Sequence, residues 1–244
     1  MELYNNLNLQ VINVGENNFT GEITADLEEM SKWPNIWRIQ MNDNNFTGSL
    51  PPSIGNISSL QYLDLGSNNL EGTIPDSVVN CRRLISLILD TNPRLTGPVP
   101  RDIGNLRKLT TIVIYETQLN GTIPESIGNC STLQYLVLST NNLTGSIPPT
   151  VGQCLTLNFA SNSLSGDIPP EIGNFTKLRV LQFGGNKFRS ELKVDFSRVT
   201  SSTLILSIFN NLFTGDIKFV GFVASLHKDR IIDTYTTILS NLSL

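Results

Sequence analysis

The sequence predicts a solenoid in which short coils stack into a curved slab, with a parallel β-sheet along the concave side and short helical turns along the convex side. A common residue frame recurs about every 24 residues. Within each copy, leucines alternate with other residues over a few positions, which is the period of a β-strand. Each copy is too short to bury its own apolar face, so it must pack against its neighbours.

The recurring frame is Leu-x-x-Leu-x-Leu-x-x-Asn-x-Leu-x-Gly-x-Ile-Pro. One copy runs from Leu60 to Pro75 and another from Leu133 to Pro148. Thr117 occupies the asparagine slot of one further unit, which brings the number of units to nine. The other eight units carry an asparagine in that slot, at Asn17, Asn44, Asn68, Asn92, Asn141, Asn162, Asn186 and Asn211.

Each part of the frame has a physical reason. Leu63 and Leu65 point to the same side of a short strand, so we expect both in the core. The Asn68 side chain carries two donors and an acceptor, and we expect it to satisfy backbone groups of its turn and of the neighbouring coil. Gly72 allows a positive φ or a close approach of chains. Pro75 ends regular pairing, and a helical turn follows on the convex side.

Units of unusual length predict where the coils differ. Spacing between anchor positions ranges from 21 to 27 residues. Extra residues fall around Met30 and near Pro93, and the shortest unit loses three residues after Cys154. All these changes lie outside the strands, where loops absorb them. Because Thr117 supplies only part of the asparagine's hydrogen-bonding groups, we expect its coil to be the weakest link of the stack.

The repeats form one domain over residues 1–217, and an irregular tail covers 218–244. Apolar residues of the tail follow helical spacing, which predicts an amphipathic helix that caps the last coil; these are Ile231, Tyr235, Ile238 and Leu242. The alternative is a degenerate tenth unit that ends at Asn241. At the other end, a repeat begins almost at once, without a polar capping unit, so we expect a fragment of a longer protein or of a shortened gene.

Six units end their frame with Gly-x-(Ile, Leu or Val)-Pro, beginning at Gly48, Gly72, Gly97, Gly121, Gly145 and Gly166. This element closely resembles the plant-specific leucine-rich repeat class, over residues 9–217. That class forms the ectodomains of receptor-like kinases and receptor-like proteins, and also polygalacturonase-inhibiting proteins. The resemblance implies an α/β solenoid, namely a right-handed leucine-rich-repeat superhelix with a parallel concave sheet and a convex side of 3-10 or short helices.

The resemblance also implies a function. Members of the class bind a peptide, steroid or pathogen molecule outside the cell, and many bind a second receptor of the same fold. This sequence contains no N-terminal cysteine-pair cap, signal peptide, transmembrane helix or kinase segment. We therefore expect an extracellular or cell-surface protein that reaches the membrane only through segments absent from this chain.

Composition and charge argue against other classes of function. The net charge is −4 and no run of lysine or arginine occurs, so a nucleic-acid partner is not expected. The single histidine, His227, lies in the tail, and no nucleophile–base set or phosphate-binding loop is present. We expect no enzyme activity, no cofactor and no metal. The apolar run from Phe219 to Leu226 is too short to cross a bilayer.

Three cysteines occupy the same slot of the frame, at Cys81, Cys130 and Cys154. This slot faces inward on the convex side, so we expect buried free thiols that act as small apolar groups. A disulfide between Cys130 and Cys154 is the alternative, since their coils are adjacent. Glycosylation sequons are more numerous and avoid the concave strands; they occur at Asn18, Asn45, Asn56, Asn120, Asn129, Asn142, Asn174 and Asn241.

The concave face is the predicted binding surface. Its central row should contain Asn13, Gln40, Asp64, Ile88, Val113, Val137, Asn158, Gln182 and Ser207. An extended peptide is expected to lie across the third to sixth units, over an apolar centre with an acidic margin. Aromatic residues and arginine on an exposed rigid sheet are typical interface anchors. The candidate ligand-binding residues are Trp37, Arg38, Gln40, Asp43, Tyr62, Asp64, Ile88, Asp90, Val113, Tyr115, Glu116, Tyr135 and Val137.

The sequence therefore predicts the ligand-recognition ectodomain, or part of one, of a plant receptor-like kinase or receptor-like protein. Its expected partners are a peptide or protein ligand and a co-receptor of the same fold. One alternative is a secreted protein that resembles the polygalacturonase inhibitors and blocks a cell-wall enzyme through the same face. The other is a non-functional gene fragment.

Overall fold

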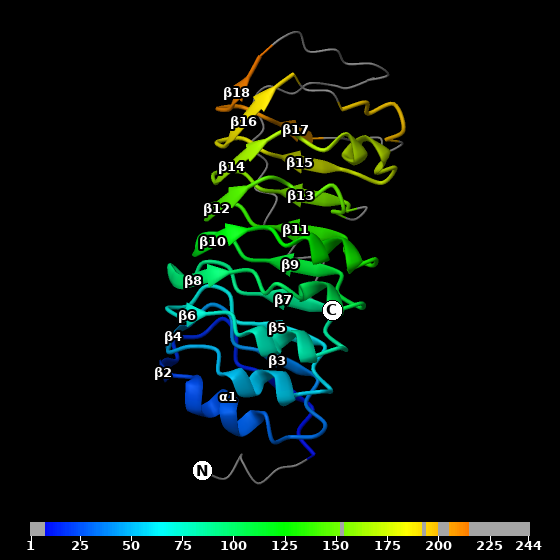
Figure 1. The fold of residues 1–244 in the computed structure, drawn as a ribbon. Helices are drawn as coiled ribbons and strands as arrows, with labels where there is room; N and C mark the ends of the chain where they lie inside the picture. The colour runs from blue at the N-terminus through cyan, green and yellow to red at the C-terminus, as the bar shows by residue number, and fades with distance from the viewer. Residues whose placement is uncertain (1–7, 152–153, 192–193, 200–204, 215–244) are drawn as a thin grey trace.

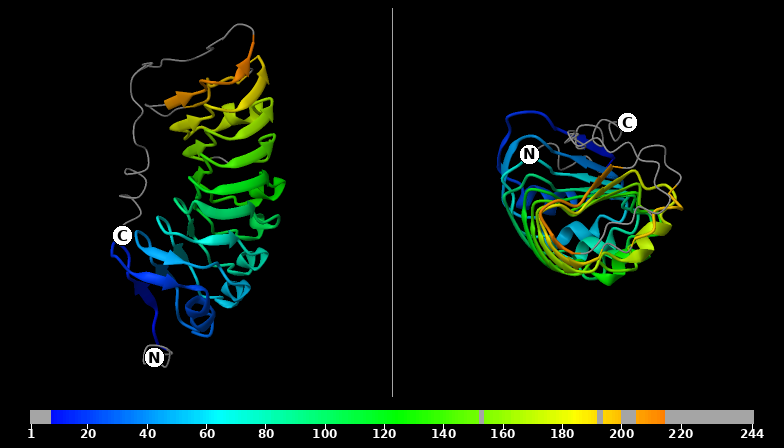
Figure 2. Two further views of the ribbon diagram at one scale, coloured as in Figure 1. Left: turned by 90° about the vertical axis from the view of Figure 1, so that its left-hand side faces the viewer. Right: turned by 90° about the horizontal axis from the view of Figure 1, so that it is seen from above.

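A computed structural model describes residues 8–151, 154–191, 194–199 and 205–214. The described residues form a curved stack of coils (Figures 1 and 2). The capping helix predicted within 218–244, and the sequon at Asn241, lie outside the described residues.

One face of the stack is a sheet of nine parallel strands that pair in chain order along the solenoid. Each strand has three residues and alternates inward and outward side chains, as a period of two requires. The strands are β1 (Val11–Asn13), β3 (Arg38–Gln40), β5 (Tyr62–Asp64), β7 (Ser86–Ile88), β9 (Thr111–Val113), β11 (Tyr135–Val137), β13 (Thr156–Asn158), β15 (Val180–Gln182) and β17 (Ile205–Ser207).

A second sheet runs beside the first, at the left of the stack in Figure 1. It contains seven parallel strands from β6 to β18, and a separate pair, β2 and β4, precedes it. These strands are β2 (Thr20–Glu22), β4 (Asn45–Thr47), β6 (Glu71–Thr73), β8 (Arg94–Pro98), β10 (Gln118–Thr122), β12 (Asn142–Gly145), β14 (Ser163–Gly166), β16 (Lys187–Ser190) and β18 (Leu212–Phe213).

The convex side carries the predicted short helical turns, most of which are 3-10 helices. These are η2 (Pro52–Asn56), η3 (Asp76–Asn80), η4 (Ile103–Asn105), η5 (Glu125–Asn129) and η6 (Pro170–Asn174). The longest unit instead forms an α-helix, α1 (Thr24–Met30), because its extra residues allow a longer helical segment. The shortest unit, between Asn141 and Asn162, has no helix among its described residues.

Inward leucines and isoleucines build one continuous apolar column; Leu63 and Leu65, for example, are fully buried. Towards the C-terminal end, phenylalanines take over this role. The rings of Phe159 and Phe183 stack with centroids 5.8 Å apart, within the range that favours aromatic pairs. The column therefore links each coil to its neighbours, as a solenoid requires.

Glycine serves two purposes in the frame. At Gly72, φ is +76°, a left-handed conformation that side-chain-bearing residues rarely adopt. At Gly104, an added Cβ would come within 2.0 Å of the Ser126 carbonyl oxygen in the next coil. Here glycine allows successive 3-10 helices to pack closely on the convex side.

The anchor asparagines form the predicted hydrogen-bonded ladder. The Asn92 Nδ2 group donates to the carbonyl oxygens of Leu65, Leu89 and Asp90, at 3.0, 3.1 and 3.0 Å. Its Oδ1 atom accepts from the Leu70 amide at 2.9 Å. Each such side chain thus satisfies its own turn and the preceding coil, which removes the cost of burying an amide.

Thr117 interrupts this ladder, and we expect Thr117→Asn to stabilise the chain. The Thr117 hydroxyl donates its one hydrogen to the Asn141 Oδ1 atom. The backbone carbonyl groups that an asparagine Nδ2 would bind at this position therefore receive no hydrogen bond from residue 117. The variant should gain about 1 kcal/mol in free energy of unfolding. Urea unfolding followed by circular dichroism measures this gain. Thr122→Asn, at an exposed residue of β10, is the matched control; an equal gain there would contradict the ladder explanation.

Candidate ligand-binding face

The register of the nine-stranded sheet places the predicted central row on one line. Adjacent strands pair Asn13 with Gln40, Gln40 with Asp64, and Asp64 with Ile88. The line continues through Val113, Val137, Asn158, Gln182 and Ser207. One residue from each strand therefore contributes to a continuous strip along the concave face.

The predicted apolar centre of this strip is not exposed, which corrects the sequence-based expectation. Ile88, Val113 and Val137 have at most 5% of their surface accessible. They form a cluster of their own, and Tyr115 and Tyr135 pack against it as half-buried residues. The tyrosines, and not the aliphatic residues, therefore present the apolar surface of this region.

The residues of the predicted acidic margin differ in how deeply they are buried. Asp90 is buried, Asp64 is half-buried, and Glu116 is exposed. Asp43 and Glu116 each occupy the position before the anchor residue, where the backbone is left-handed, with φ values of 51° and 52°. That position recurs in most units, so the turn fixes where these carboxylates leave the strand.

An aromatic and cationic group covers the sheet at its N-terminal end. Trp37 and Tyr62 meet edge to face, with ring centroids 5.9 Å apart. The Arg38 guanidinium carbon lies 5.3 Å from the centre of the Tyr62 ring, within cation–π distance. Adjacent strands thus bring three of the predicted residues into contact.

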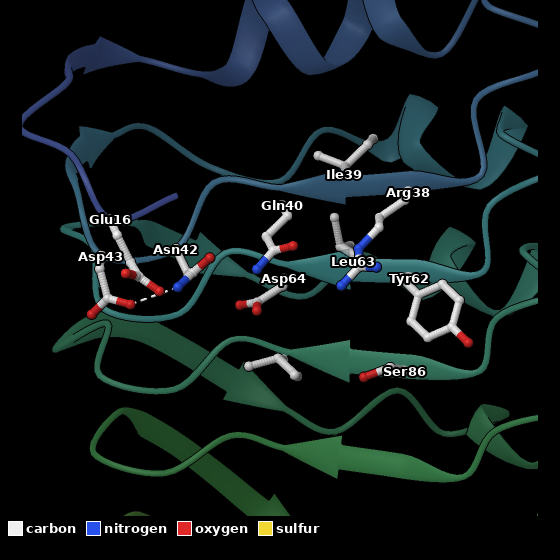
Figure 3. A pocket seen from close by; sticks show the side chains of 11 residues that line it. Glu16, Arg38, Ile39, Gln40, Asn42, Asp43, Tyr62, Leu63, Asp64 and Ser86 are labelled. Carbon is white, nitrogen blue, oxygen red and sulfur yellow. Dashed lines mark hydrogen bonds between the residues drawn. The ribbon is translucent and has the colours of Figure 1, made fainter. Parts of the chain in front are cut away.

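Beside this group lies a hollow of about 150 Å³, which we call the acidic hollow. Figure 3 shows Asp43 and Glu16 at one end, Arg38 and Tyr62 at the other, and Asp64 between them. Its full lining is Glu16, Arg38, Ile39, Gln40, Asn42, Asp43, Tyr62, Leu63, Asp64, Ser86 and Ile88.

The Asp64 carboxyl is the least water-accessible acid that lines this hollow. Burial raises its pKa to about 7, and the charges of Asp90 and Asp43 add to the increase. The Gly66 amide, which donates to Oδ1 at 3.2 Å, and the Arg38 charge oppose it. Near neutral pH, the protonated and the ionised forms of Asp64 are therefore both populated.

Asp90 lies next to Asp64 across Gly66. An added Cβ on Gly66 would come within 2.8 Å of an Asp90 carboxylate oxygen and 3.5 Å of one from Asp64. Burial raises the pKa of Asp90 to about 6, while hydrogen bonds from Tyr115 and Thr91 limit the increase. Burial, followed by the Asp90 charge, raises the pKa of the Tyr115 hydroxyl in turn.

Ser86 is a site residue that sequence analysis missed. It is 3% exposed, lines the acidic hollow, and its hydroxyl has no hydrogen-bond partner. The residue pairs with Tyr62 across β5 and β7, which sets its outward direction. A single serine in a strand carries no signal of its own in the sequence. Its place in the lining of the hollow follows from the register that sets it beside Tyr62.

Comparison with known proteins identifies the repeat. A family model described as Leucine Rich Repeat matches residues 35–57, 59–81, 132–154 and 155–175. These four stretches of the chain are leucine-rich repeats. No curated protein sequence matches it. Its similar solved structures include leucine-rich-repeat ectodomains of plant receptor kinases, in agreement with the plant class of repeat.

One similar structure is a plant peptide hormone receptor, RGFR1, in complex with RGF2. It has 32% sequence identity and a TM-score of 0.78, and the match covers 86% of this chain and 37% of that one. A second is the Arabidopsis receptor kinase HAESA with the peptide hormone IDA and the co-receptor SERK1. Its identity is 28% and its TM-score 0.75, and the match covers 86% of this chain and 39% of that one.

A third similar structure is a plant ice-binding protein, with 27% identity and a TM-score of 0.71. The match covers 83% of this chain and 65% of that one. The leucine-rich-repeat chain thus spans under two fifths of the length of the two receptor structures. Among its described residues, no helix has the length and apolar character needed to span a membrane.

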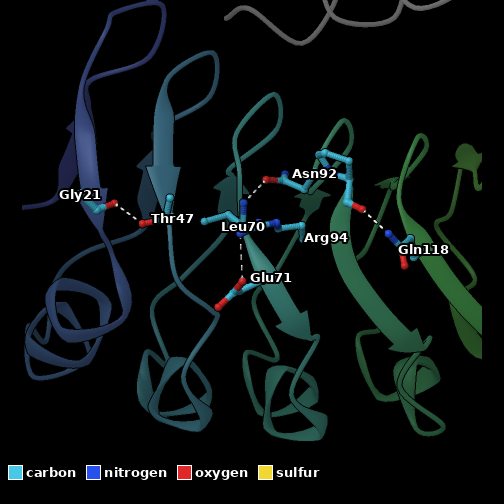
Figure 4. A network of polar contacts seen from close by, with 8 residues as sticks. Gly21, Thr47, Leu70, Glu71, Asn92, Arg94 and Gln118 are labelled. Carbon is cyan, nitrogen blue, oxygen red and sulfur yellow. Dashed lines mark hydrogen bonds and ion pairs between the residues drawn. The ribbon is translucent and has the colours of Figure 1, made fainter.

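Polar residues around the second sheet join the leucine-rich-repeat coils to one another (Figure 4). The Thr47 hydroxyl donates to the Gly21 carbonyl oxygen at 3.2 Å, and Gln118 Nε2 donates to that of Pro93 at 2.6 Å. Arg94 and Glu71 form an exposed ion pair at 3.5 Å. These contacts stabilise the stack, and the exposed ion pair adds little to it.

The three cysteines are free thiols in the leucine-rich-repeat core, as expected, and no disulfide joins Cys130 to Cys154. Cys81 donates through Sγ to the Ile54 carbonyl oxygen at 3.2 Å, and Cys130 donates to that of Ile103 at 3.5 Å. Burial raises their pKa values to about 12 and 11, and that of Cys154 to about 12. The thiols are therefore protonated and unreactive at neutral pH.

The described sequon asparagines are all exposed, at Asn18, Asn45, Asn56, Asn120, Asn129, Asn142 and Asn174. Asn120 and Asn142 lie in the second sheet, and Asn56, Asn129 and Asn174 end convex 3-10 helices. Asn45 Nδ2 donates to the Asn18 Oδ1 atom at 2.7 Å. None of these seven side chains belongs to the nine concave strands.

Proposed function

We propose that this chain is part of the extracellular ectodomain of a plant receptor-like kinase or receptor-like protein, and that its concave face binds a peptide. The observation that carries the proposal is the composition of that face. Half-buried Tyr115 and Tyr135 pack against a buried apolar cluster, and the acidic hollow lies directly beside it, since Ile88 belongs to both. Such a combination offers both apolar contact and charge recognition to one extended ligand.

The sheet suits this role because it is already formed. Backbone hydrogen bonds fix every concave strand, so the protein side loses little conformational entropy when a ligand binds. Strands in a parallel sheet are about 4.8 Å apart, so an extended peptide of about 6 residues spans the strands from β3 to β11. Binding of this kind requires no catalytic group, cofactor or metal.

The similar receptors support the choice of ligand and of a second partner. RGFR1 and HAESA were each solved with a peptide, and HAESA also with the co-receptor SERK1. We extend this to a co-receptor of the same fold for the present chain. We also propose that its exposed sequons carry glycans, because every described one leaves the concave strands uncovered.

A displayed library of random peptides tests the proposal. The full chain is expected to select peptides that bind with micromolar affinity, and Tyr135→Ala should weaken binding about tenfold by removing an aromatic anchor. Thr96→Ala, on the second sheet, is the matched control and should leave affinity unchanged. Recovery of no binders, or equal loss in both variants, would contradict a concave peptide site.

A further inference from the structure

The acidic hollow holds more negative than positive charge. Three carboxylates, of Glu16, Asp43 and Asp64, line it together with one guanidinium, that of Arg38. The Arg38 group lies against the Tyr62 ring at one end, which leaves the acids at the middle and opposite end without an equal number of cations. The Asp43 carboxylate accepts from Asn42 Nδ2 at 2.6 Å, a neutral donor that does not compensate its charge.

An unsatisfied buried group points to a ligand in the same place. The Ser86 hydroxyl is buried, lines the hollow and has no partner. Such groups are rare in folded proteins because each costs about 1–3 kcal/mol in lost hydrogen bonding. A polar ligand atom next to Ser86 would supply the missing bond.

We propose that the acidic hollow is a subsite for a basic side chain of the ligand, and that an arginine guanidinium fits it best. This assignment rests on the proposed peptide-binding function and specifies one side chain of that peptide. A guanidinium offers five N–H donors in a planar fork. Asp64 and Ser86 can accept some of these bonds, and Asp43 at the open end can accept others.

The charge balance gives the subsite a pH dependence. The groups that face Asp64 are Asp90 from the turn after β7, Asp43 and Arg38 from the β3 unit, and Glu16 at the far end of the hollow. An arginine side chain stays charged from pH 5 to 8, whereas Asp64, with its pKa near 7, gains its charge in this range. Bound cation favours the ionised carboxylate, so affinity should rise with pH.

Acetyl-arginine amide is the probe that isolates this subsite from the rest of the peptide. The full chain at pH 7.5 should bind it with a dissociation constant on the order of 1 mM, measured by NMR titration. Acetyl-citrulline amide has nearly the same shape without the charge and should not bind measurably. Lowering the pH to 5 should weaken binding of the arginine probe about tenfold.

Two variants test the residues. Asp64→Asn keeps the shape and removes the charge, and should weaken binding about tenfold. Ser86→Ala removes the hydroxyl and should weaken it about threefold. Asp76→Asn, at an exposed convex position, is the matched control. Circular dichroism confirms that each variant is folded.

The outcomes separate this subsite from the wider function. If acetyl-arginine amide does not bind, or binds no better than the citrulline compound, or keeps its affinity in Asp64→Asn, the subsite assignment is wrong. Selected peptides that still depend on Tyr135 would then leave the proposed peptide-binding function intact. Arginine binding that Asp64→Asn and low pH both weaken would support the assignment, even where Tyr135→Ala has no effect on the small probe.

Discussion

Asn92→Ala is expected to lower the free energy of unfolding by about 4 kcal/mol, because it removes four hydrogen bonds from a fully buried side chain. The loss exceeds that of an ordinary surface change because the Leu89 carbonyl and the Leu70 amide would remain buried without partners. The carbonyl groups of Leu65 and Asp90 would keep only their bonds from Asn68 Nδ2 and the Ser67 amide. Urea unfolding followed by circular dichroism measures the change. The melting temperature should fall by roughly 10 °C.

The position of the damage is as informative as its size. In a solenoid each coil contacts only its neighbours, so the loss should first loosen the coils around Asn92. Hydrogen exchange at the Leu70 amide, which donates to the Asn92 side chain, should become faster. Asn105→Ala, at an exposed 3-10 position, is the control. Similar losses at both sites would show that the ladder does not hold the coils together.

The second large effect is a fall in stability as the pH rises from about 4 to 7. Asp64 has a pKa of about 7 in the folded chain and Asp90 has a pKa of about 6, whereas the ordinary pKa of an aspartate side chain is 3.8. A raised carboxyl pKa means that the folded state keeps protons that the unfolded chain has released. Stability from these groups is therefore complete below pH 4 and is lost as the pH rises through 6 and 7.

Asp64→Asn should remove most of this dependence and stabilise the chain by about 3 kcal/mol at pH 8. Urea unfolding at pH 5 and pH 8 measures both values in the wild type and the variant. Asp76→Asn, exposed on the convex side, is the control and should keep the wild-type dependence. A wild type that is equally stable at both pH values would mean that the concave carboxylates are well solvated.

The sequence predicted the repeating parts of the structure because they depend on short spacings. Alternation around Leu63 placed it inside and Asp64 outside, and the anchor asparagines fixed the register of each strand with the next. The row from Asn13 to Ser207 follows from these two rules alone. The left-handed glycine of each frame follows in the same way.

Burial on the concave face could not be read from these rules, because it depends on the side chains of adjacent coils. Ile88, Val113 and Val137 lie on the outward row yet are covered, since tyrosines from neighbouring positions pack against them. The unpartnered hydroxyl of Ser86 depends on its contacts with other strands in the same way. The helix α1 was also missed, since extra residues reveal a longer loop but not its conformation.

Photo-cross-linking tests the location of the binding face. A benzoylphenylalanine residue is placed at position 135 on the concave sheet or at position 108 on the convex side, and each protein is irradiated with a selected peptide. A concave site predicts efficient capture from position 135 and background capture from position 108. Capture from position 108 alone would contradict it.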